Sequence, residues 1–171
     1  MRALLTLLTF AVFALCAYGM WRGWHRKAAR QQHLLPLPAA PAETSAPLLD
    51  PATGLFVGTT ISGDWQARVV AGQLSDRSAA TLRLCAEGVL VERDGAADLF
   101  IPVDAVCDAR LDSALAGKVM GEGRLLVVTW AHGGELLDTA FRADVHTVHV
   151  PYLHALLNLV QGTPTTTGRN S

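Results

Sequence analysis

The sequence predicts a mainly β (α+β) fold, in which an N-terminal transmembrane helix precedes a small β-barrel or sandwich capped by a C-terminal helix. Three observations predict it. Residues 3–21 contain no charged residue, short β-like runs separated by turn dipeptides fill residues 55–142, and apolar residues recur at helical spacing after residue 144. Half of the 171 residues are apolar and only 17% are charged, so the composition excludes an intrinsically disordered chain.

The first predicted element is a membrane anchor at residues 1–24, with its span at residues 3–21. Nineteen residues of α-helix are about 28 Å long, close to the ~30 Å hydrocarbon core of a bilayer. A cleavable signal peptide fits less well, because the run exceeds the usual apolar region of roughly 7–15 residues and no small-x-small site ends it. Aromatic and cationic side chains favour the headgroup region, and the predicted membrane-interface residues are Tyr18, Trp21, Arg22, Trp24, Arg26, Lys27 and Arg30.

The basic residues around the span predict its orientation. One arginine precedes the span, whereas four basic residues follow it within nine positions. The positive-inside rule then predicts a plasma-membrane protein with its N-terminus outside and its C-terminal domain in the cytoplasm. Gly19 and Gly23 are four positions apart, a spacing that supports helix pairing, so an oligomer through the span is a further expectation.

Residues 25–53 are predicted to form a basic collar and a proline-rich linker. Five of the eight prolines lie between residues 34 and 53. Proline at that density blocks the interiors of helices and strands, which predicts an extended, semi-stiff tether. Its leucines can contact the membrane surface or the domain that follows.

The domain itself is predicted at residues 54–162, with a flexible tail at 163–171. Strands are expected at 55–61, 81–85, 89–93, 99–102, 124–131 and 135–142, with a weaker candidate at 110–115. The run 124–131 is the strongest candidate for a central strand. A helix follows, starting from Asp144 as its cap or from Pro151 in its first turn, and ending at Gly162.

Strongly bent antiparallel strands closed by a C-terminal helix are the architecture of pleckstrin-homology-like (PH-like) domains. The segments Gly58-Thr59-Thr60, Gly63-Asp64-Trp65 with Arg68, Ala116-Gly117-Lys118-Val119, Leu125–Trp130 and Leu136–Arg142 carry a more specific likeness. Over residues 1–160 the chain resembles an actinobacterial family of single-pass membrane proteins with a PH-like domain, encoded near pyrimidine-biosynthesis genes and described loosely as transporters or export proteins. It departs from that pattern at Ala140, where the family has glycine. The resemblance implies fold and location but no known active site.

No catalytic, cofactor-binding or metal-binding residue is predicted. The chain lacks a GxSxG nucleophile motif, a P-loop and a GxGxxG dinucleotide fingerprint. His146, His149 and His154 recur at helical spacing, but no third ligand stands at metal-site spacing. Cys85 is expected to be a small core residue, and both it and Cys107 are expected to be free thiols. An enzyme with a site assembled from dispersed residues is the least favoured function.

The charge of the domain limits its partners. Residues 54–162 contain eight basic residues against thirteen acidic ones, which argues against nucleic acid and against phosphoinositide-type lipid binding. A protein partner fits better, because PH-like barrels offer a sheet edge and a groove. The candidate interaction residues are Trp65, Arg68 and Lys118, whereas Trp130 is expected in the core. The predicted function is a membrane-anchored cytoplasmic protein-interaction or scaffold module, and the alternative is an accessory subunit of a membrane transport or export system.

Overall fold

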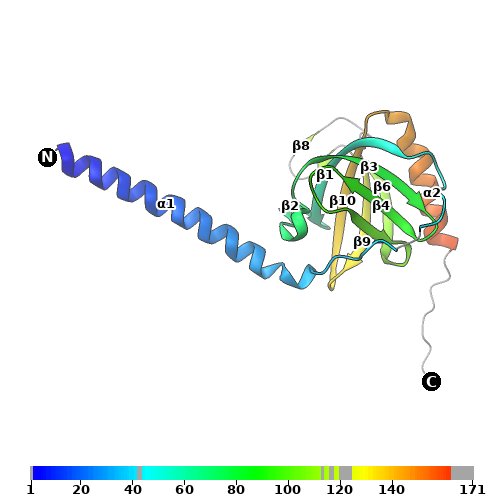
Figure 1. Cartoon of the computed structure of the whole chain (residues 1–171), viewed down its shortest axis with the longest axis horizontal. Coiled ribbons are helices and arrows are strands. Elements are labelled where there is room, and N and C mark those ends of the chain that lie inside the picture. The colour runs from blue at the N-terminus through cyan, green and yellow to red at the C-terminus, as the bar shows by residue number, and fades with distance from the viewer. Residues whose placement is uncertain (1, 42–43, 113, 116–117, 120–124, 163–171) are drawn as a thin grey trace, which may run out of the picture.

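The computed structural model describes residues 2–41, 44–112, 114–115, 118–119 and 125–162. Within these ranges it does not describe the side chains of residues 2–8, 24–30, 32, 65, 114–115 and 118–119. Figure 1 shows a long N-terminal helix that projects from a β-rich domain, and a second helix packed on the opposite side of that domain.

The N-terminal helix α1 (Arg2–Arg30) contains no proline and has 29 residues, which makes it about 43 Å long. Its large apolar side chains face outward along the described part, where Phe10, Phe13 and Met20 are each more than 70% exposed. Among the residues that the structure describes, none of the helices combines the length and the apolar character needed to cross a membrane.

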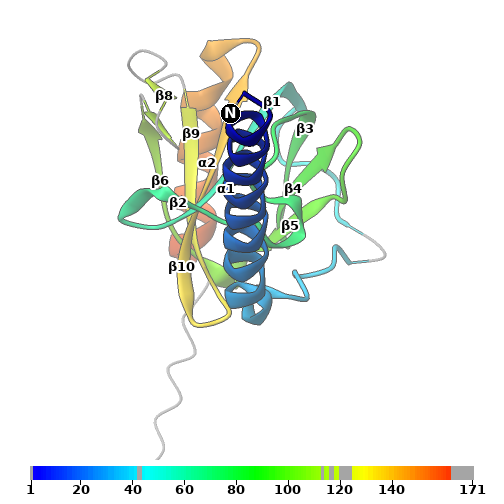
Figure 2. The ribbon, with the colours of Figure 1, turned by 90° about the vertical axis from the view of Figure 1, so that its left-hand side faces the viewer.

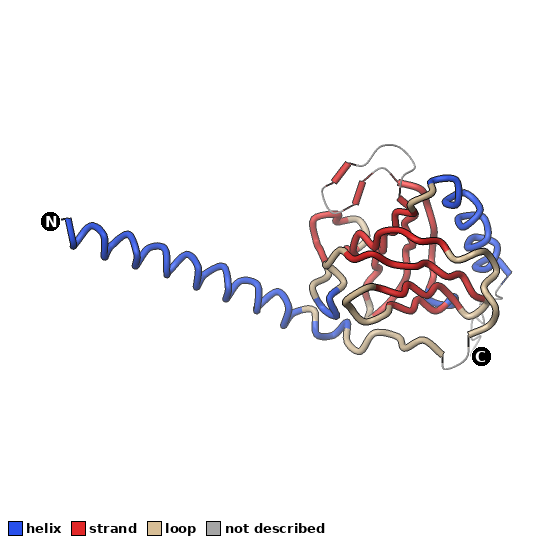
Figure 3. Tube along the Cα trace, turned by 45° about the horizontal axis from the view of Figure 1, so that its top comes forward, coloured by secondary structure: helices blue, strands red, loops and turns tan. Residues whose placement is uncertain are grey.

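The described strands form one strongly bent antiparallel sheet and a separate two-stranded hairpin (Figures 1 and 3). The order in the large sheet is β5-β4-β3-β1-β10-β9-β6, and β2 pairs with β1 beside this path. The hairpin is β7-β8. The bounds are β1 (Ala52–Ile61), β2 (Asp64–Arg68), β3 (Ser78–Cys85), β4 (Gly88–Arg93), β5 (Leu99–Pro102), β6 (Val106–Asp112), β7 (Ala114–Leu115), β8 (Lys118–Val119), β9 (Leu125–His132) and β10 (Glu135–Ala143).

The predicted mainly β domain with a C-terminal helix is confirmed, and six of its strands lie where the sequence places them, as β1, β3, β4, β5, β9 and β10. The weaker candidate at 110–115 is displaced, because β6 begins at Val106 and ends at Asp112. The short strand β2 and the hairpin β7-β8 are additional. The sequence of β2, Asp-Trp-Gln-Ala-Arg, alternates polar and apolar residues, which is a strand pattern that the sequence-based expectations above do not include.

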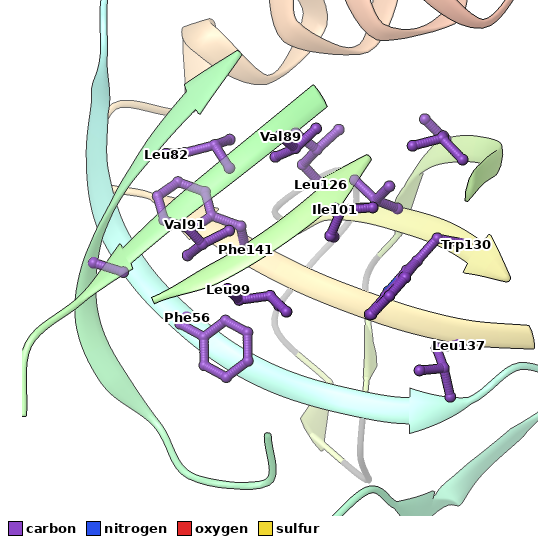
Figure 4. Close-up of a cluster of buried hydrophobic side chains, with 14 of the residues drawn as sticks. Phe56, Leu82, Val89, Val91, Leu99, Ile101, Leu126, Trp130, Leu137 and Phe141 are labelled. Carbon is purple, nitrogen blue, oxygen red and sulfur yellow. The ribbon is translucent and has the colours of Figure 1, made fainter. Parts of the chain in front are cut away.

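The core lies inside the bend of the sheet, where side chains from both of its halves meet (Figure 4). Trp130 is fully buried there, as expected, and its indole Nε1 donates a hydrogen bond to Thr139 Oγ1 at 2.9 Å. The strand β9 is buried on both faces. Leu126, Val128 and Trp130 join this core, while the alternate residues Leu125 and Val127 form a second, smaller cluster with Val57 and Ala140.

The C-terminal helix α2 (His149–Gly162) closes the barrel with its apolar face, and its fully packed residues include Tyr152 and Leu156. It begins two residues before Pro151, which is tolerated because backbone N–H groups in the first turn have no partner within the helix. The Tyr152 hydroxyl donates to the backbone oxygens of Asp50 (2.8 Å) and Leu82 (3.1 Å). This shared bond ties the helix to the sheet and to the chain that enters β1.

Candidate interaction surface

The three predicted interaction residues lie on two hairpins at the side of the domain nearer α1. Trp65 and Arg68 belong to β2, and Lys118 belongs to β8 (Figure 2). The side chains of Trp65 and Lys118 lie outside the described part of the chain. Arg68 is half-buried, and its Nη1 donates to the backbone oxygen of Ser75 at 3.2 Å. The arginine therefore fastens β2 to the chain that follows it.

The predicted membrane-interface residues follow one another along the second half of α1. Tyr18, Trp21 and Arg22 are exposed, and the rings of the first two are tilted with their centroids 6.1 Å apart. Trp24, Arg26, Lys27 and Arg30 belong to the part of α1 whose side chains are not described. All seven lie in the half of α1 that is nearer the domain.

A charged network lies on the outer face of β6, β9 and β10. Arg110 donates to Asp138 Oδ2 at 2.7 Å and to Thr129 Oγ1 at 2.9 Å, and the Thr129 hydroxyl donates to Asp138 Oδ1 at 2.6 Å. Burial alone would raise the pKa of Asp138, but the hydrogen bonds from Arg110, Thr129 and Ser62 and the charge of Arg110 outweigh it and hold that pKa below its usual value. The network therefore keeps one carboxylate ionised beneath a half-exposed guanidinium.

The first residues after α1 pack on the rim of the barrel, and the sequence offers no signal for the first of them, Gln31. The side-chain amide of Gln31 pairs with the backbone at the end of β2: its Oε1 accepts from Val70 N at 2.7 Å, and its Nε2 donates to Arg68 O at 3.1 Å. Gln31 is only 7% exposed. An amide that donates and accepts in this way satisfies two backbone groups as a neighbouring strand would.

Leu34 is fully buried and belongs to the main core. Its backbone oxygen accepts a hydrogen bond from His132 Nε2 at 3.1 Å, and the His132 ring stacks on Trp130 with the centroids 5.4 Å apart. The predicted linker at 25–53 thus packs on the domain here, and again at Leu48, whose N–H donates to Leu84 O at 2.8 Å. The sequence signal for this contact is the group of leucines at 34, 35 and 37 within a proline-rich stretch.

Two glycines allow the rim of the barrel to approach the incoming chain closely. A Cβ at Gly133 would lie 2.9 Å from the backbone oxygen of His33, and one at Gly72 would lie 2.8 Å from the Leu37 side chain. Both glycines have φ near +60°, where other residues are strained. We call residues 31–37 the linker segment, and the surface formed by residues 68–72 and 132–133 the rim groove.

Arg93 lies inside the domain and stabilises the turn at Gly72 and Gln73, which forms one side of the rim groove. Its guanidinium donates to the backbone oxygens of Ala97 (2.7 Å), Gln73 (2.9 Å) and Gly72 (3.4 Å), and it lies 4.9 Å from the centre of the Phe56 ring. Gln73, like Gly72, has a positive φ. The buried arginine thus satisfies the carbonyls of a turn whose backbone conformation is otherwise costly.

Within the described residues, no group of three or more His, Cys, Asp or Glu side chains could hold a metal ion. His149 is buried, its Nε2 accepts from Ala143 N at 3.0 Å, and its ring lies 5.9 Å from that of His146. The imidazole of His149 therefore fastens α2 to the end of β10. The three cysteines are free, and Cys85 is a buried core residue as expected.

Comparisons with known proteins bear on the fold. No curated protein matches the chain. Twenty chains among solved structures match it; one belongs to "The 8S snRNP Assembly Intermediate", with 12% identity and a TM-score of 0.52, covering 79% of this chain and 97% of that chain. At this identity the likeness shows the fold alone. A sequence family described as bacterial PH domain-like matches residues 34–156, from the buried leucine of the linker segment into α2. The chain belongs to this bacterial PH domain-like family.

Proposed function

We propose that α1 anchors the chain in the plasma membrane and that the PH-like domain acts as a protein-interaction or scaffold module at the cytoplasmic face. The observation that carries this proposal is a long helix with exposed apolar side chains, joined by buried contacts to a PH-like domain. Exposing large apolar side chains to water costs free energy, so we expect a lipid bilayer or another protein to bury them.

A lipid bilayer suits α1 better than a soluble partner does. The run 3–21 is apolar all round, with no charged residue on any face, whereas a helix that docks on a soluble protein normally keeps a polar face. Basic residues follow the run at once, as the positive-inside rule requires of a cytoplasmic flank. These features support an anchor with the domain in the cytoplasm.

The acidic domain supports a protein partner over a lipid or a nucleic acid. Its thirteen acidic residues against eight basic ones repel anionic headgroups and phosphates. The proposed contact surface includes Trp65, Arg68 and Lys118 on the hairpins nearer α1. Tryptophan and arginine are the residue types most often found at the energetic centres of protein interfaces.

Two experiments on the full chain test the proposal separately. For the anchor, the chain should stay in the pellet after alkaline extraction of membranes, and Phe13→Arg should shift it to the soluble fraction while the matched Leu136→Arg, at an exposed position of the domain, should not. The exposed Cys107 should react with an impermeant maleimide only after the cells are opened. A chain found mainly in the soluble fraction, or labelled from outside, would contradict the anchor or its orientation.

For the interaction module, crosslinking and capture from membranes should recover one defined protein partner. Trp65→Ala and Arg68→Ala should reduce the recovery, whereas Arg83→Ala should not, because that side chain lies on β3 in an exposed pair with Glu92. Capture without a defined partner, or equal recovery with all three variants, would contradict the proposed surface.

A further inference from the structure

The rim groove recognises the linker segment with the chemistry of a peptide-binding site. The side-chain amide of Gln31 donates to Arg68 O, at the end of β2, and accepts from Val70 N, two residues further on. Recognition of an exposed backbone edge, combined with a pocket for one side chain, is a recurring way in which domains bind extended peptides. Here the segment itself is not extended, because Gln32–Leu34 form a 3-10 turn closed by a hydrogen bond from Leu34 N to Gln31 O at 3.0 Å. The side-chain amide of Gln31 makes the two backbone hydrogen bonds that an added strand would make.

Leu34 contributes two further contacts that would distinguish one segment from another: its buried side chain and the hydrogen bond to its backbone oxygen. The leucine side chain is fully buried in the core, and His132 donates to its backbone oxygen. These contacts come from elements about 100 positions away in the sequence. A Cβ at Gly72 or Gly133 would lie within 3.0 Å of the segment, so the fit is close at these two places, whereas Leu35 is 45% exposed.

We infer that the rim groove is a peptide-binding site which the chain's own linker segment fills in cis, and that its preferred ligand is a segment with glutamine three positions before leucine, folded as the 3-10 turn that Gln32–Leu34 forms here. The inference deepens the proposed function and rests on it, because it names the kind of segment that the module binds. Every contact described above is non-covalent, so the covalent link to α1 supplies effective concentration and none of the recognition. A partner segment with the same pattern gains access when the linker segment leaves.

This arrangement makes occupancy of the groove depend on the anchor. α1 ends at Arg30 and Gln31 is already in the groove, so a displacement of the helix relative to the domain pulls directly on the bound segment. The linker segment then acts as an autoinhibitory ligand, and removing it exposes the edge at residues 68–70 and the leucine pocket together.

The test uses the full chain in detergent micelles and a fluorescent synthetic peptide with the sequence of residues 29–40. Leu34→Ala empties the pocket in cis, and we expect this variant to bind the peptide saturably by fluorescence anisotropy. The unaltered chain should bind it about tenfold more weakly or worse, because its own segment competes at a high effective concentration. The matched control is the same peptide with Gln31→Ala, which is at least as apolar and so enters micelles equally well. It should bind several-fold more weakly.

A folded Leu34→Ala chain that shows no saturable binding would overturn the inference, as would equal affinity for the two peptides. If Leu34→Ala fails to fold, Gln31→Ala in the full chain replaces it. That variant keeps the buried leucine, loses both amide hydrogen bonds, and should bind the unaltered peptide more tightly than the unaltered chain does. Equal affinity of the two chains would then refute the inference. Partner capture that depends on Trp65 and Arg68 while the peptide fails to bind contradicts the groove alone and leaves the proposed function standing.

Discussion

Leu34→Ala is the sharpest test of whether residues 31–37 belong to the folded domain. The side chain is fully buried in the main core, and the substitution removes three carbon atoms from it. At about 0.8 kcal/mol per buried carbon the lost transfer free energy is about 2.4 kcal/mol. Incomplete collapse of the cavity adds to this, so we expect a loss of about 3–4 kcal/mol in the free energy of unfolding. For a domain of this size that lowers Tm by roughly 10 °C or more.

The assay is urea and thermal unfolding of the full chain in detergent micelles, followed by tryptophan fluorescence. Leu48→Ala is the matched control within the same proline-rich stretch. That side chain is 49% exposed, and its backbone bond to Leu84 survives the change, so its cost should stay below about 1 kcal/mol. If the two variants lose equal stability, the linker segment is a tether and the reasoning about the rim groove fails.

Three further substitutions probe other contacts. Arg93→Met removes three hydrogen bonds to backbone carbonyls and should cost about 2–4 kcal/mol in urea unfolding, whereas Arg83→Met, in an exposed ion pair, should cost under about 1 kcal/mol. Tyr152→Phe leaves the buried carbonyl of Leu82 and the part-buried carbonyl of Asp50 without this donor and should cost about 1–2 kcal/mol, with faster amide exchange in α2. Because the folded pKa of Asp138 is depressed, its stabilisation is complete above about pH 4 and is lost as pH falls through the folded pKa. Urea midpoints of the unaltered chain should therefore fall more steeply below pH 4 than those of Asp138→Asn, and equal slopes would refute the assignment.

The parts of the fold that the sequence predicts are those set by local pattern. The run Leu125–Trp130 predicts a central strand because every residue in it is apolar or β-branched, and β9 is buried on both faces. His132-Gly133-Gly134 and Asp94-Gly95 predict turns, and positive φ is found at all three of these glycines. In each of these segments the residues of the segment itself are enough to predict its backbone conformation.

The rim groove could not be predicted, because its parts are far apart in the sequence. Gln31 meets Val70 across 39 positions and Leu34 meets His132 across 98, and neither partner carries a recognisable motif. A glutamine just after a basic helix carries no sign of burial. The leucines of the proline-rich stretch allow contact with either the membrane surface or the domain, and the sequence does not decide between the two. Only the closed barrel brings residues 68–70 and the β9-β10 turn to the same rim.

The contacts of Gln31 and Leu34 also constrain how a membrane-anchored domain would be presented. α1 runs to Arg30 and the next residue is buried on the barrel, so no free chain separates the basic collar from the domain. If α1 crosses a bilayer, the side of the domain that carries β2 and β8 lies toward the headgroups, and α2 faces the cytoplasm (Figures 1 and 2). A partner that binds Trp65 and Arg68 would then approach within the narrow layer beside the membrane, which favours another membrane protein over a diffusing soluble one. A soluble partner would instead find the face of α2 open to it.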